Sequence, residues 1–373
     1  MWYFRSPTVV YGEDALSFLN SQKYLKILIV TDRNLERSGL VSLVHSQLPR
    51  GAEVNIIDTI PEEPALSDIV RQTGKVSQFG PDLIIGLGGG SVMDAAKALF
   101  VSYERPDLDL HDITPLVSLN LRKKSRLILI PTTSGTGSEC TWAAVLSDED
   151  HRRKNEFASP EIIADYAILD PVLVQNLPTP ITRNTAVDAI THAVEGHSNL
   201  WHNPYSEALA EKALKMISYN LPWVLRNNDA KSRELVHIGA SMAGLAFSNS
   251  QIGLAHAMGH SLGAHFRIPH GMTVGLFLPS VVDFNQDRSE ESYSVLRDCF
   301  PERYRSKTLG DTLRKYFHEI GQPINLKGAG IDSDEYELKL NSLVQLAEES
   351  TGIITNPRDA QSQDILDLFE SVM

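Results

Sequence analysis

The sequence predicts an α/β domain built on a parallel sheet, followed by an all-helical domain. Three observations lead to this prediction. Apolar runs that end in turn residues alternate with helical stretches in the first half of the chain. Two of these runs lead into loops rich in glycine and hydroxyl side chains, at the position where open α/β sheets bind their ligands. Beyond residue 180, few strand-like runs remain.

Four apolar runs predict the strands of the sheet: LKILIVTD (25–32), AEVNIID (52–58), PDLIIGLGGG (81–90) and RLILIPTT (126–133). Continuous apolar runs of this length are typical of parallel strands that are buried on both faces. The stretches 66–79 and 91–103, which lie between them, have helical character. This alternation of strand and helix is typical of a doubly wound α/β domain.

The pattern changes after LPTPITRNT (177–185), where Pro178 and Pro180 interrupt the chain. Beyond them, helices are predicted over the stretches 186–198, 204–225 and 232–247. We therefore expect an α/β domain over residues 1–180 and a helical domain over residues 181–373.

The composition of the chain indicates which partners it can bind and in which cellular compartment it acts. The chain of 373 residues carries a formal net charge of −13, and an acidic protein repels nucleic-acid phosphates and anionic lipid, so neither is an expected partner. Two cysteines are too few for a disulfide framework and indicate a reducing compartment. No stretch reaches the roughly 18 apolar residues of a membrane span. The first residues lack the basic and apolar regions of a signal peptide, so we expect a cytoplasmic protein.

The turn Gly88-Gly89-Gly90-Ser91 is the clearest binding pattern of the first half. It follows a buried strand and precedes a helix. Glycines let backbone N–H groups approach an anion, and the helix N-terminus adds partial positive charge. The alternative is a tight turn without a ligand, but three consecutive glycines exceed what a turn needs. The pattern predicts a phosphate site, although it is not the G-x-G-x-x-G fingerprint.

Two further features lie at the ends of predicted strands. The loop PTTSGTGSECT (131–141) offers six hydroxyl side chains and two glycines, although such loops often bind nothing. Asp32 ends the first strand, where a carboxylate can accept hydrogen bonds from a ribose and repel a 2′-phosphate. An N-cap or turn aspartate is an equally good interpretation of Asp32 taken alone. Together these features predict a Rossmann-like dinucleotide-binding domain.

Histidines are concentrated in the second half. His256, His260, His265 and His270, a third of the chain's 12 histidines, lie in AHAMGHSLGAHFRIPHG (255–271). In VDAITHAVEGH, Asp188 and a histidine lie four residues apart, a spacing that puts both on one face of a helix. Carboxylate and imidazole together suit a divalent first-row metal. Spacing alone does not decide which histidines of the cluster would bind it.

These motifs carry a resemblance that runs nearly end to end. The sequence resembles the iron-containing (group III) alcohol dehydrogenase family, which has the dehydroquinate synthase-like fold. The resemblance begins at FRSPTVVYGEDAL and passes through GGGSVMDAAKA, PTTSGTGSE, AVDAITHAVEG, AGLAFSN and HAMGHSLGAHFRIPHG to TNPRDAQSQDILDLFE. The paired histidine motif is its most specific part.

The resemblance implies roles for individual residues. The family's metal ligands fall on Asp188, His192, His256 and His270. Its non-ligand active-site histidine falls on His260, and an aromatic wall of its substrate pocket falls on Phe247. Its cofactor-binding positions fall on Asp32, Gly89, Gly90, Ser91, Asp94, Thr132, Thr133, Thr141 and Lys154.

The resemblance also implies a function. We expect an enzyme, an NAD(P)-dependent alcohol dehydrogenase that transfers a hydride between a small alcohol and the cofactor, and a homodimer. NAD is the expected cofactor, with NADP as an alternative; Fe²⁺ is the expected metal, with Zn²⁺ as an alternative. The rival functions are a polyol or phosphopolyol dehydrogenase, a hydroxyacid–oxoacid transhydrogenase, and a non-catalytic protein that kept the fold.

Overall fold

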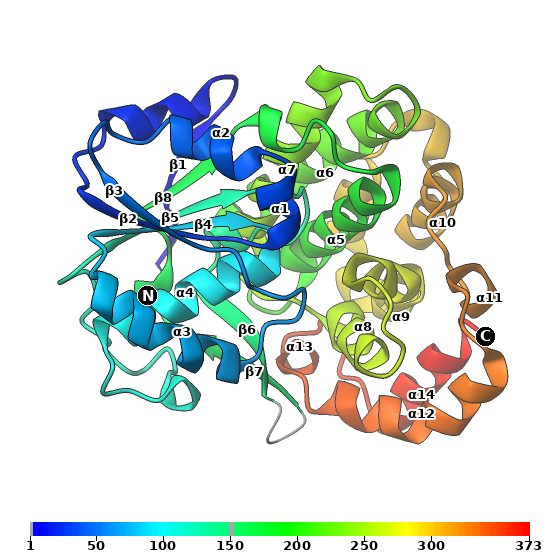
Figure 1. Ribbon diagram of the computed structural model, residues 1–373. Coiled ribbons are helices and arrows are strands. Elements are labelled where there is room, and N and C mark those ends of the chain that lie inside the picture. Colours follow the sequence, from blue (N-terminus) through cyan, green and yellow to red (C-terminus); the bar gives the residue numbers. More distant parts are fainter. Residues whose placement is uncertain (1–2, 149–152) are drawn as a thin grey trace. The chain divides into compact units, whose positions relative to one another are not determined.

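The computed structural model describes residues 3–148 and 153–373 (Figure 1). It forms two compact units. The α/β unit comprises Arg5–Thr133 and Gly137–Asn176. The helical unit comprises Ser134–Thr136 and Leu177–Met373, together with Tyr3 and Phe4. The predicted boundary at residue 180 lies at the start of the first long helix of the helical unit.

The α/β unit contains a six-stranded parallel sheet with the order β1-β8-β5-β4-β2-β3. Its strands are β1 (Thr8–Tyr11), β2 (Lys26–Val30), β3 (Glu53–Ile57), β4 (Leu83–Gly88), β5 (Arg126–Pro131) and β8 (Tyr166–Leu169). The four predicted runs form β2 to β5, the middle of the sheet and one edge. The sequence prediction did not include β1 and β8, which are only four residues long.

The strands β2, β4 and β5 are buried on both faces, as their continuous apolar runs predict. The same prediction is wrong for β3, which is the edge strand and is mostly exposed. In β2, Ile27 and Ile29 point into one core, whereas Leu28 and Val30 point into another. The second core includes residues of α3 (Leu66–Phe79) and α4 (Gly90–Glu104), and the first includes residues of α2 (Leu40–Ser46). Figure 1 shows α2 on one side of the sheet and α3 and α4 on the other. The predicted doubly wound α/β architecture is therefore confirmed.

The other elements of this unit are short. An antiparallel hairpin joins β6 (Ala143–Asp148) to β7 (Arg153–Ala158), and the sequence prediction did not include it. The short helices are α1 (Arg33–Arg37) and the 3₁₀ segments Ala15–Ser21, Leu110–Asp112, Ser138–Cys140, Pro160–Ile162 and Pro171–Leu173.

The helical unit has no strand among its described residues. Its long helices are α5 (Thr179–Ser198), α6 (Pro204–Asn227), α7 (Ala230–Ser248), α8 (Leu254–His265), α9 (His270–Arg297), α10 (Leu309–Ile320) and α12 (Ser333–Glu348). The shorter ones are α11 (Leu326–Ala329), α13 (Thr351–Ile354), α14 (Ser362–Glu370) and the 3₁₀ segment Glu302–Tyr304. Because α5 packs against α6, α7 and α9, it is buried along nearly its whole length. The predicted all-helical second domain is thereby confirmed.

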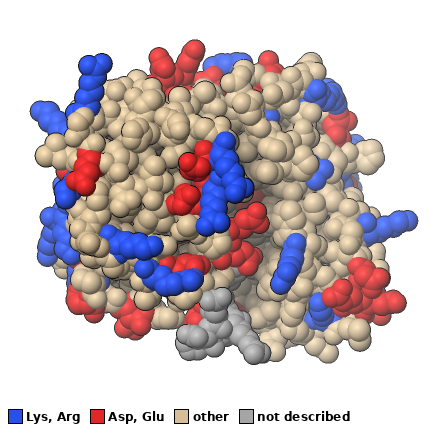
Figure 2. Space-filling model, viewed as in Figure 1, with Lys and Arg blue, Asp and Glu red and all other residues tan. Residues whose placement is uncertain are grey.

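The surface carries charges of both signs. On the face shown in Figure 2, basic side chains lie beside acidic ones. Among the helices of the described residues, none combines the length and apolar character that a membrane crossing requires.

Candidate metal and dinucleotide sites

Three helices bring the candidate metal ligands together. Asp188 and His192 lie one turn apart on α5, so their side chains share a face of that helix. His256 lies in the first turn of α8, and His270 is the first residue of α9. Segments that are far apart in the sequence therefore present a carboxylate and three imidazoles to one another.

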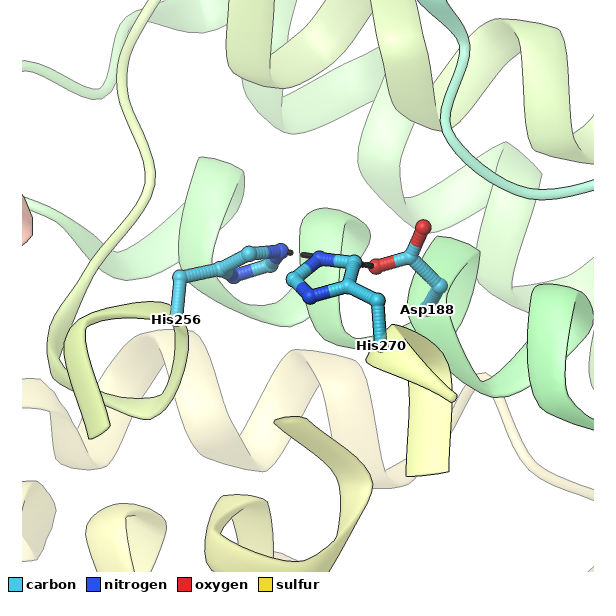
Figure 3. Close-up of side chains that lie close together, drawn as sticks. All are labelled: Asp188, His256 and His270. Carbon is cyan, nitrogen blue, oxygen red and sulfur yellow. Dashed lines mark ion pairs between the residues drawn. The ribbon is translucent and has the colours of Figure 1, made fainter. Parts of the chain in front are cut away.

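Asp188 takes part in both ion pairs of this group, which are drawn as dashed lines in Figure 3. Its Oδ1 atom lies 3.5 Å from Nε2 of His256 and 3.4 Å from Nε2 of His270. One ligand atom from each of these three residues lies within 4.8 Å of the other two. Asp188 and His256 are buried, whereas 39% of the His270 side chain is exposed. The group can therefore hold one ion and is open at His270.

His192 lies beside this group. Its Nδ1 atom is 3.8 Å from Oδ1 of Asp188, and its ring stacks on that of His256 with 4.4 Å between centroids. The other face of the ring stacks on Phe247 at 4.1 Å. His192 falls outside the group of three whose ligand atoms satisfy the 4.8 Å spacing, and aromatic contacts fix its ring.

Unpartnered polar atoms test whether these residues fit a metal. Asp188 Oδ1, His192 Nδ1 and His256 Nε2 are all buried and have no hydrogen-bond partner. A buried polar atom without a partner costs about 1–3 kcal/mol, so three of them side by side are unusual. A divalent cation would satisfy all three at once, and imidazole with carboxylate is a ligand set for first-row metals. The residues therefore fit the metal that their chemistry implies.

The protonation states of Asp188 and His192 support this fit. Burial alone would raise the pKa of the Asp188 carboxyl, but the imidazoles of His192 and His270 outweigh burial and hold that pKa well below its usual range. Burial lowers the pKa of His192 to about 3, so its ring is neutral. An anionic carboxylate and a neutral imidazole are the forms that bind a metal.

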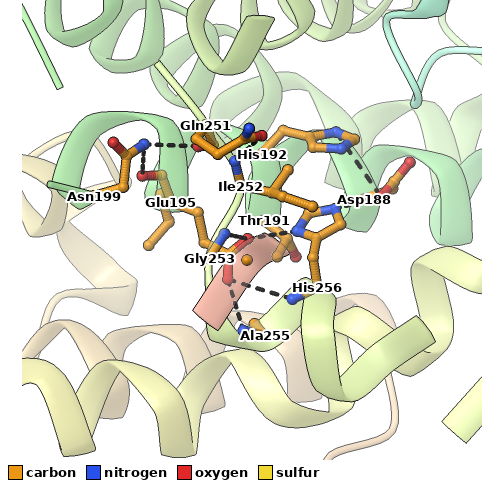
Figure 4. A network of polar contacts seen from close by, with 12 residues as sticks. Asp188, Thr191, His192, Glu195, Asn199, Gln251, Ile252, Gly253, Ala255 and His256 are labelled. Carbon is orange, nitrogen blue, oxygen red and sulfur yellow. Dashed lines mark hydrogen bonds and ion pairs between the residues drawn. The ribbon is translucent and has the colours of Figure 1, made fainter. Parts of the chain in front are cut away.

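Glu195 was not among the residues predicted from the sequence, although it lies one turn beyond His192 on α5. Its carboxylate accepts a hydrogen bond of 2.5 Å from Nδ1 of His256 (Figure 4). Burial would lower the pKa of His256, but the charge of Glu195 outweighs burial, and the pKa rises to about 9. The i, i+4, i+7 spacing of Asp188, His192 and Glu195 is the sequence signal that could have identified this residue.

The predicted active-site histidine lies at the edge of the cluster. The His260 ring stacks on that of His270 with centroids 4.9 Å apart, and it meets the His256 ring edge-on at 5.9 Å. His260 is exposed and contributes no atom to the three-residue group. It is therefore close to the candidate ligands without being one of them.

The glycine turn of the α/β unit has the form of an anion site. Gly88 ends β4, and Gly89 is the N-cap of α4. No side chain caps this helix, so the N–H groups of its first turn, including those of Gly90 and Ser91, lack a capping acceptor. A Cβ at Gly88 would lie 2.5 Å from Cβ of Val92, which explains the need for glycine there. The Ser91 hydroxyl donates to the Glu62 carbonyl at 2.5 Å.

A buried lysine connects α4 to the loop after β5. Lys97 donates to Ser138 Oγ (3.0 Å), to Thr141 Oγ1 (2.9 Å) and to the carbonyl of Ala143 (2.8 Å). Asp94 accepts from Ser138 Oγ at 2.6 Å. Burial lowers the pKa of Lys97 against the opposing charge of Asp94. The sequence prediction included Asp94 and Thr141 but not Lys97, which connects them.

The remaining predicted cofactor residues lie at the ends of strands. Asp32 follows β2, and its Oδ1 atom caps α1 by accepting from the N–H groups of Asn34 (2.7 Å) and Leu35 (3.1 Å). The N-cap interpretation of Asp32 is therefore correct, and Oδ1 is the oxygen that makes both bonds. Thr132 and Thr133 follow β5. Lys154 lies in β7, and its side chain is outside the described residues.

Two family models match the chain. The model described as "Iron-containing alcohol dehydrogenase" matches residues 6–171, and the model described as "Fe-containing alcohol dehydrogenase family, C-terminal" matches residues 182–373. Together they cover both units.

Individual relatives match over the full length. The chain is 33% identical over 372 residues to the NADPH-dependent butanol dehydrogenase of Clostridium saccharobutylicum, covering 98% of this chain and 96% of that protein. It is 33% identical over 381 residues to an alcohol dehydrogenase of Thermococcus barophilus, covering 99% of both. Among solved structures, the iron-containing alcohol dehydrogenase of Thermococcus thioreducens matches with a TM-score of 0.90 and 31% identity, covering 100% of this chain and 99% of that one.

Proposed function

The chain belongs to the iron-containing alcohol dehydrogenase family, and from this membership we propose that it transfers a hydride between a small alcohol and NAD(P) at a metal centre in its helical unit. The enzyme is an oxidoreductase. The observation that carries the proposal is the set of buried, unpartnered ligand atoms on Asp188, His192 and His256. Alcohols are the substrates that the names of these relatives give.

Four side chains would hold the metal: Asp188, His192, His256 and His270. The first three are buried, and His270 is partly exposed. When bound there, a divalent metal would supply Lewis-acid polarisation of the substrate oxygen. Four protein ligands and a substrate oxygen exceed a closed tetrahedral zinc set, which favours Fe²⁺, with Zn²⁺ as the alternative.

The chain's own residues would bind and orient the substrate. His260 is exposed beside His270 and can exchange a proton with the substrate oxygen or with water, as a general acid–base. Phe247 presents an apolar ring beside His192 and would form a wall of the pocket. Asp188 stays anionic beside the imidazoles of His192 and His270, so its negative charge would balance that of a bound cation.

The α/β unit would bind the dinucleotide. The uncapped first turn of α4, with Gly89, Gly90 and Ser91, would receive the pyrophosphate. The loop that Lys97 and Asp94 organise, with Thr132, Thr133 and Thr141, lies at the carboxyl end of β5 and would contact the rest of the cofactor. Lys154 completes the proposed set.

The choice between the two cofactors depends on Asp32. A carboxylate near the adenosine ribose favours NAD over NADP. One relative is named as NADPH-dependent, so we propose NAD as the preferred cofactor and NADP as the alternative.

A steady-state assay tests the proposal. The metal-free protein is loaded with Fe²⁺ under anaerobic conditions, or with Zn²⁺, and mixed with NAD⁺ or NADP⁺ and a panel of primary alcohols and diols. We expect metal-dependent reduction of the nicotinamide and its reversal with aldehydes. Turnover that is undiminished in the metal-free protein, or absent with the whole panel in both directions, would contradict the proposal. Exchange between a hydroxyacid and an oxoacid without added cofactor would instead identify a transhydrogenase.

The cellular setting is also proposed rather than tested. The two cysteines fit a reducing compartment, and we propose that the protein acts in the cytoplasm on small molecules. The homodimer is proposed from the family resemblance. Size-exclusion chromatography with light scattering would measure the oligomeric state.

A further inference from the structure

One carboxylate connects the two helices that carry the first three candidate ligands. Glu195 of α5 accepts four hydrogen bonds, all from the first turn of α8 and its N-cap (Figure 4). Oε1 accepts from the N–H groups of Ala255 (2.7 Å) and His256 (3.3 Å), and Oε2 accepts from N–H of Gly253 (2.9 Å) and Nδ1 of His256 (2.5 Å). Glu195 is 5% exposed and His256 1% exposed, so water does not compete for these bonds.

The hydrogen bond between Nδ1 of His256 and Glu195 determines which nitrogen of the ring carries the proton. A carboxylate offers only acceptors, so Nδ1 of His256 must carry a proton to bond with it. In the neutral ring, Nε2 then has a free lone pair. Nε2 is also the buried, unpartnered atom that lies 3.5 Å from Asp188. Glu195 and Asp188 therefore contact opposite nitrogens of one ring.

The surrounding chain is shaped for this contact. A Cβ on Gly253 would lie 3.0 Å from Oε1 of Glu195, so the absence of a side chain there gives the carboxylate room. The segment before α8 is held independently: the Asn199 amide donates to the carbonyl of Gln251 (2.6 Å), and the Thr355 hydroxyl donates to the carbonyl of Ile252 (2.7 Å). These two anchors hold the segment without contacting the ring of His256.

We propose that Glu195 is a positioning residue for the metal centre: it holds the His256 ring in the Nδ1–H tautomer and in the orientation that presents Nε2 to the metal. This inference rests on the proposed metal site. A ligating imidazole whose other nitrogen donates to a carboxylate is better oriented and more basic than one without such a partner.

The variant Glu195→Gln tests the proposal directly. Glutamine replaces one of the two acceptor oxygens by an amide nitrogen, which is a donor. Wherever that nitrogen lies, it faces N–H groups that had bonded to the oxygen it replaces. A backbone N–H group can only donate. The His256 ring, by contrast, can shift its proton from Nδ1 to Nε2 and then accept a hydrogen bond from the amide at Nδ1. The proton would then lie on the ligand atom. We expect the dissociation constant for Zn²⁺, measured by chelator competition on the metal-free protein, to rise by about 10- to 100-fold.

Thr355→Val is the matched control. It removes the buried bond to Ile252 and loosens the same segment, but it leaves the contact between Glu195 and His256 intact. We expect it to lower the free energy of unfolding while the affinity for Zn²⁺ stays at the wild-type value. Equal Zn²⁺ affinity in Glu195→Gln and wild type would overturn the proposal, as would an equal loss of affinity in both variants.

A second measurement needs no substitution at Glu195, and so it holds even if that variant does not fold. In ¹⁵N-histidine-labelled protein loaded with Zn²⁺, we expect a slowly exchanging proton on Nδ1 of His256, with His256→Gln identifying the signal. A proton on Nε2, or none on Nδ1, would refute the proposed tautomer. If the wild-type protein binds no Zn²⁺, the proposed metal site fails; if it binds Zn²⁺ regardless of residue 195, only the role of Glu195 fails.

Discussion

Nε2 of His256 lies 3.5 Å from Oδ1 of Asp188, and both atoms are buried without a hydrogen-bond partner. This pair predicts that His256→Ala abolishes stoichiometric binding of Fe²⁺ or Zn²⁺ and with it turnover. The fold should persist, because none of the ligand side chains is a member of the apolar core of the helical unit. Metal analysis and circular dichroism measure the two effects. His265→Ala, from the same histidine cluster, is the control and should keep its metal; full metal content in His256→Ala would refute the assignment.

His260 should affect the rate and not the metal content. It stacks on His270 but supplies no atom to the ligand group. We expect His260→Ala to keep stoichiometric metal and to lose about 10²-fold in kcat if the ring acts as a general acid–base. The pH profile of kcat/KM should lose one limb. A wild-type rate at every pH would exclude this role.

Asp32 should influence cofactor choice through its charge. Asp32→Ser keeps an oxygen to cap α1, because serine is a good N-cap, and removes the negative charge. We expect the ratio of kcat/KM for NADP⁺ to that for NAD⁺ to rise by roughly tenfold, the equivalent of about 1.4 kcal/mol. Glu36→Gln removes an exposed charge from the same helix and should leave the ratio unchanged. A wild-type preference for NADP⁺ that the Asp32 variant retains would show that the carboxylate does not face the ribose.

Lys97 should be required for the stability of the α/β unit. Lys97→Met fits the space but leaves Asp94, Ser138 and Thr141 without their buried cation. Removing one partner of a buried ion pair costs about 3–5 kcal/mol, so the urea midpoint should fall markedly and NAD⁺ should bind more weakly. Lys75→Met, on the exposed face of α3, should change the midpoint little. A midpoint equal to that of wild type would contradict this account.

His237 should make stability depend on pH below neutrality. Burial lowers its pKa to about 4, and its Nδ1 atom lies 3.0 Å from Ser134 Oγ. Between pH 4 and about 6.5, the unfolded chain binds a proton that the folded protein does not, so stability is full above pH 6.5 and is lost as the pH falls. For a shift of this size, the contribution is on the order of 3 kcal/mol. The metal-free variant His237→Asn should lose less stability than wild type across this window; parallel curves would refute the assignment.

Local patterns predicted the elements that depend on local chemistry. The strands β2, β4 and β5 come from long apolar runs because each is buried on both faces, and such burial is visible in composition. The short strand β1 has no such signal: Tyr11 is 65% exposed, and the strand exists because it pairs with β8, about 160 residues further along the chain. The hairpin β6–β7 likewise depends on pairing rather than on a long apolar run.

The difference between local patterns and contacts between distant segments also explains which residues of the candidate site were predicted. Helical spacing put Asp188 and His192 on one face of α5, which is a local property. The contact between Glu195 and His256 spans 61 positions and depends on how α5 packs beside α8. Helical spacing could therefore have placed Glu195 on the ligand face of α5, but it could not have identified His256 as its partner. Lys97 was missed for a similar reason, because its partners Ser138 and Thr141 come from another segment.

The anchoring of the segment before α8 also has a consequence for biosynthesis. The Thr355 hydroxyl holds the carbonyl of Ile252, and Gly352 packs so closely on Gly253 that a Cβ at position 352 would lie 2.4 Å from the Gly253 carbonyl oxygen. Both contacts come from residues translated about 100 positions after the segment that they hold. Domains fold as units as they leave the ribosome, so a nascent chain that ends before residue 352 lacks the support of its first ligand-bearing turn on α8. The metal is therefore expected to bind only after the polypeptide is complete. A chain truncated before residue 352 is expected to bind less metal than the full chain.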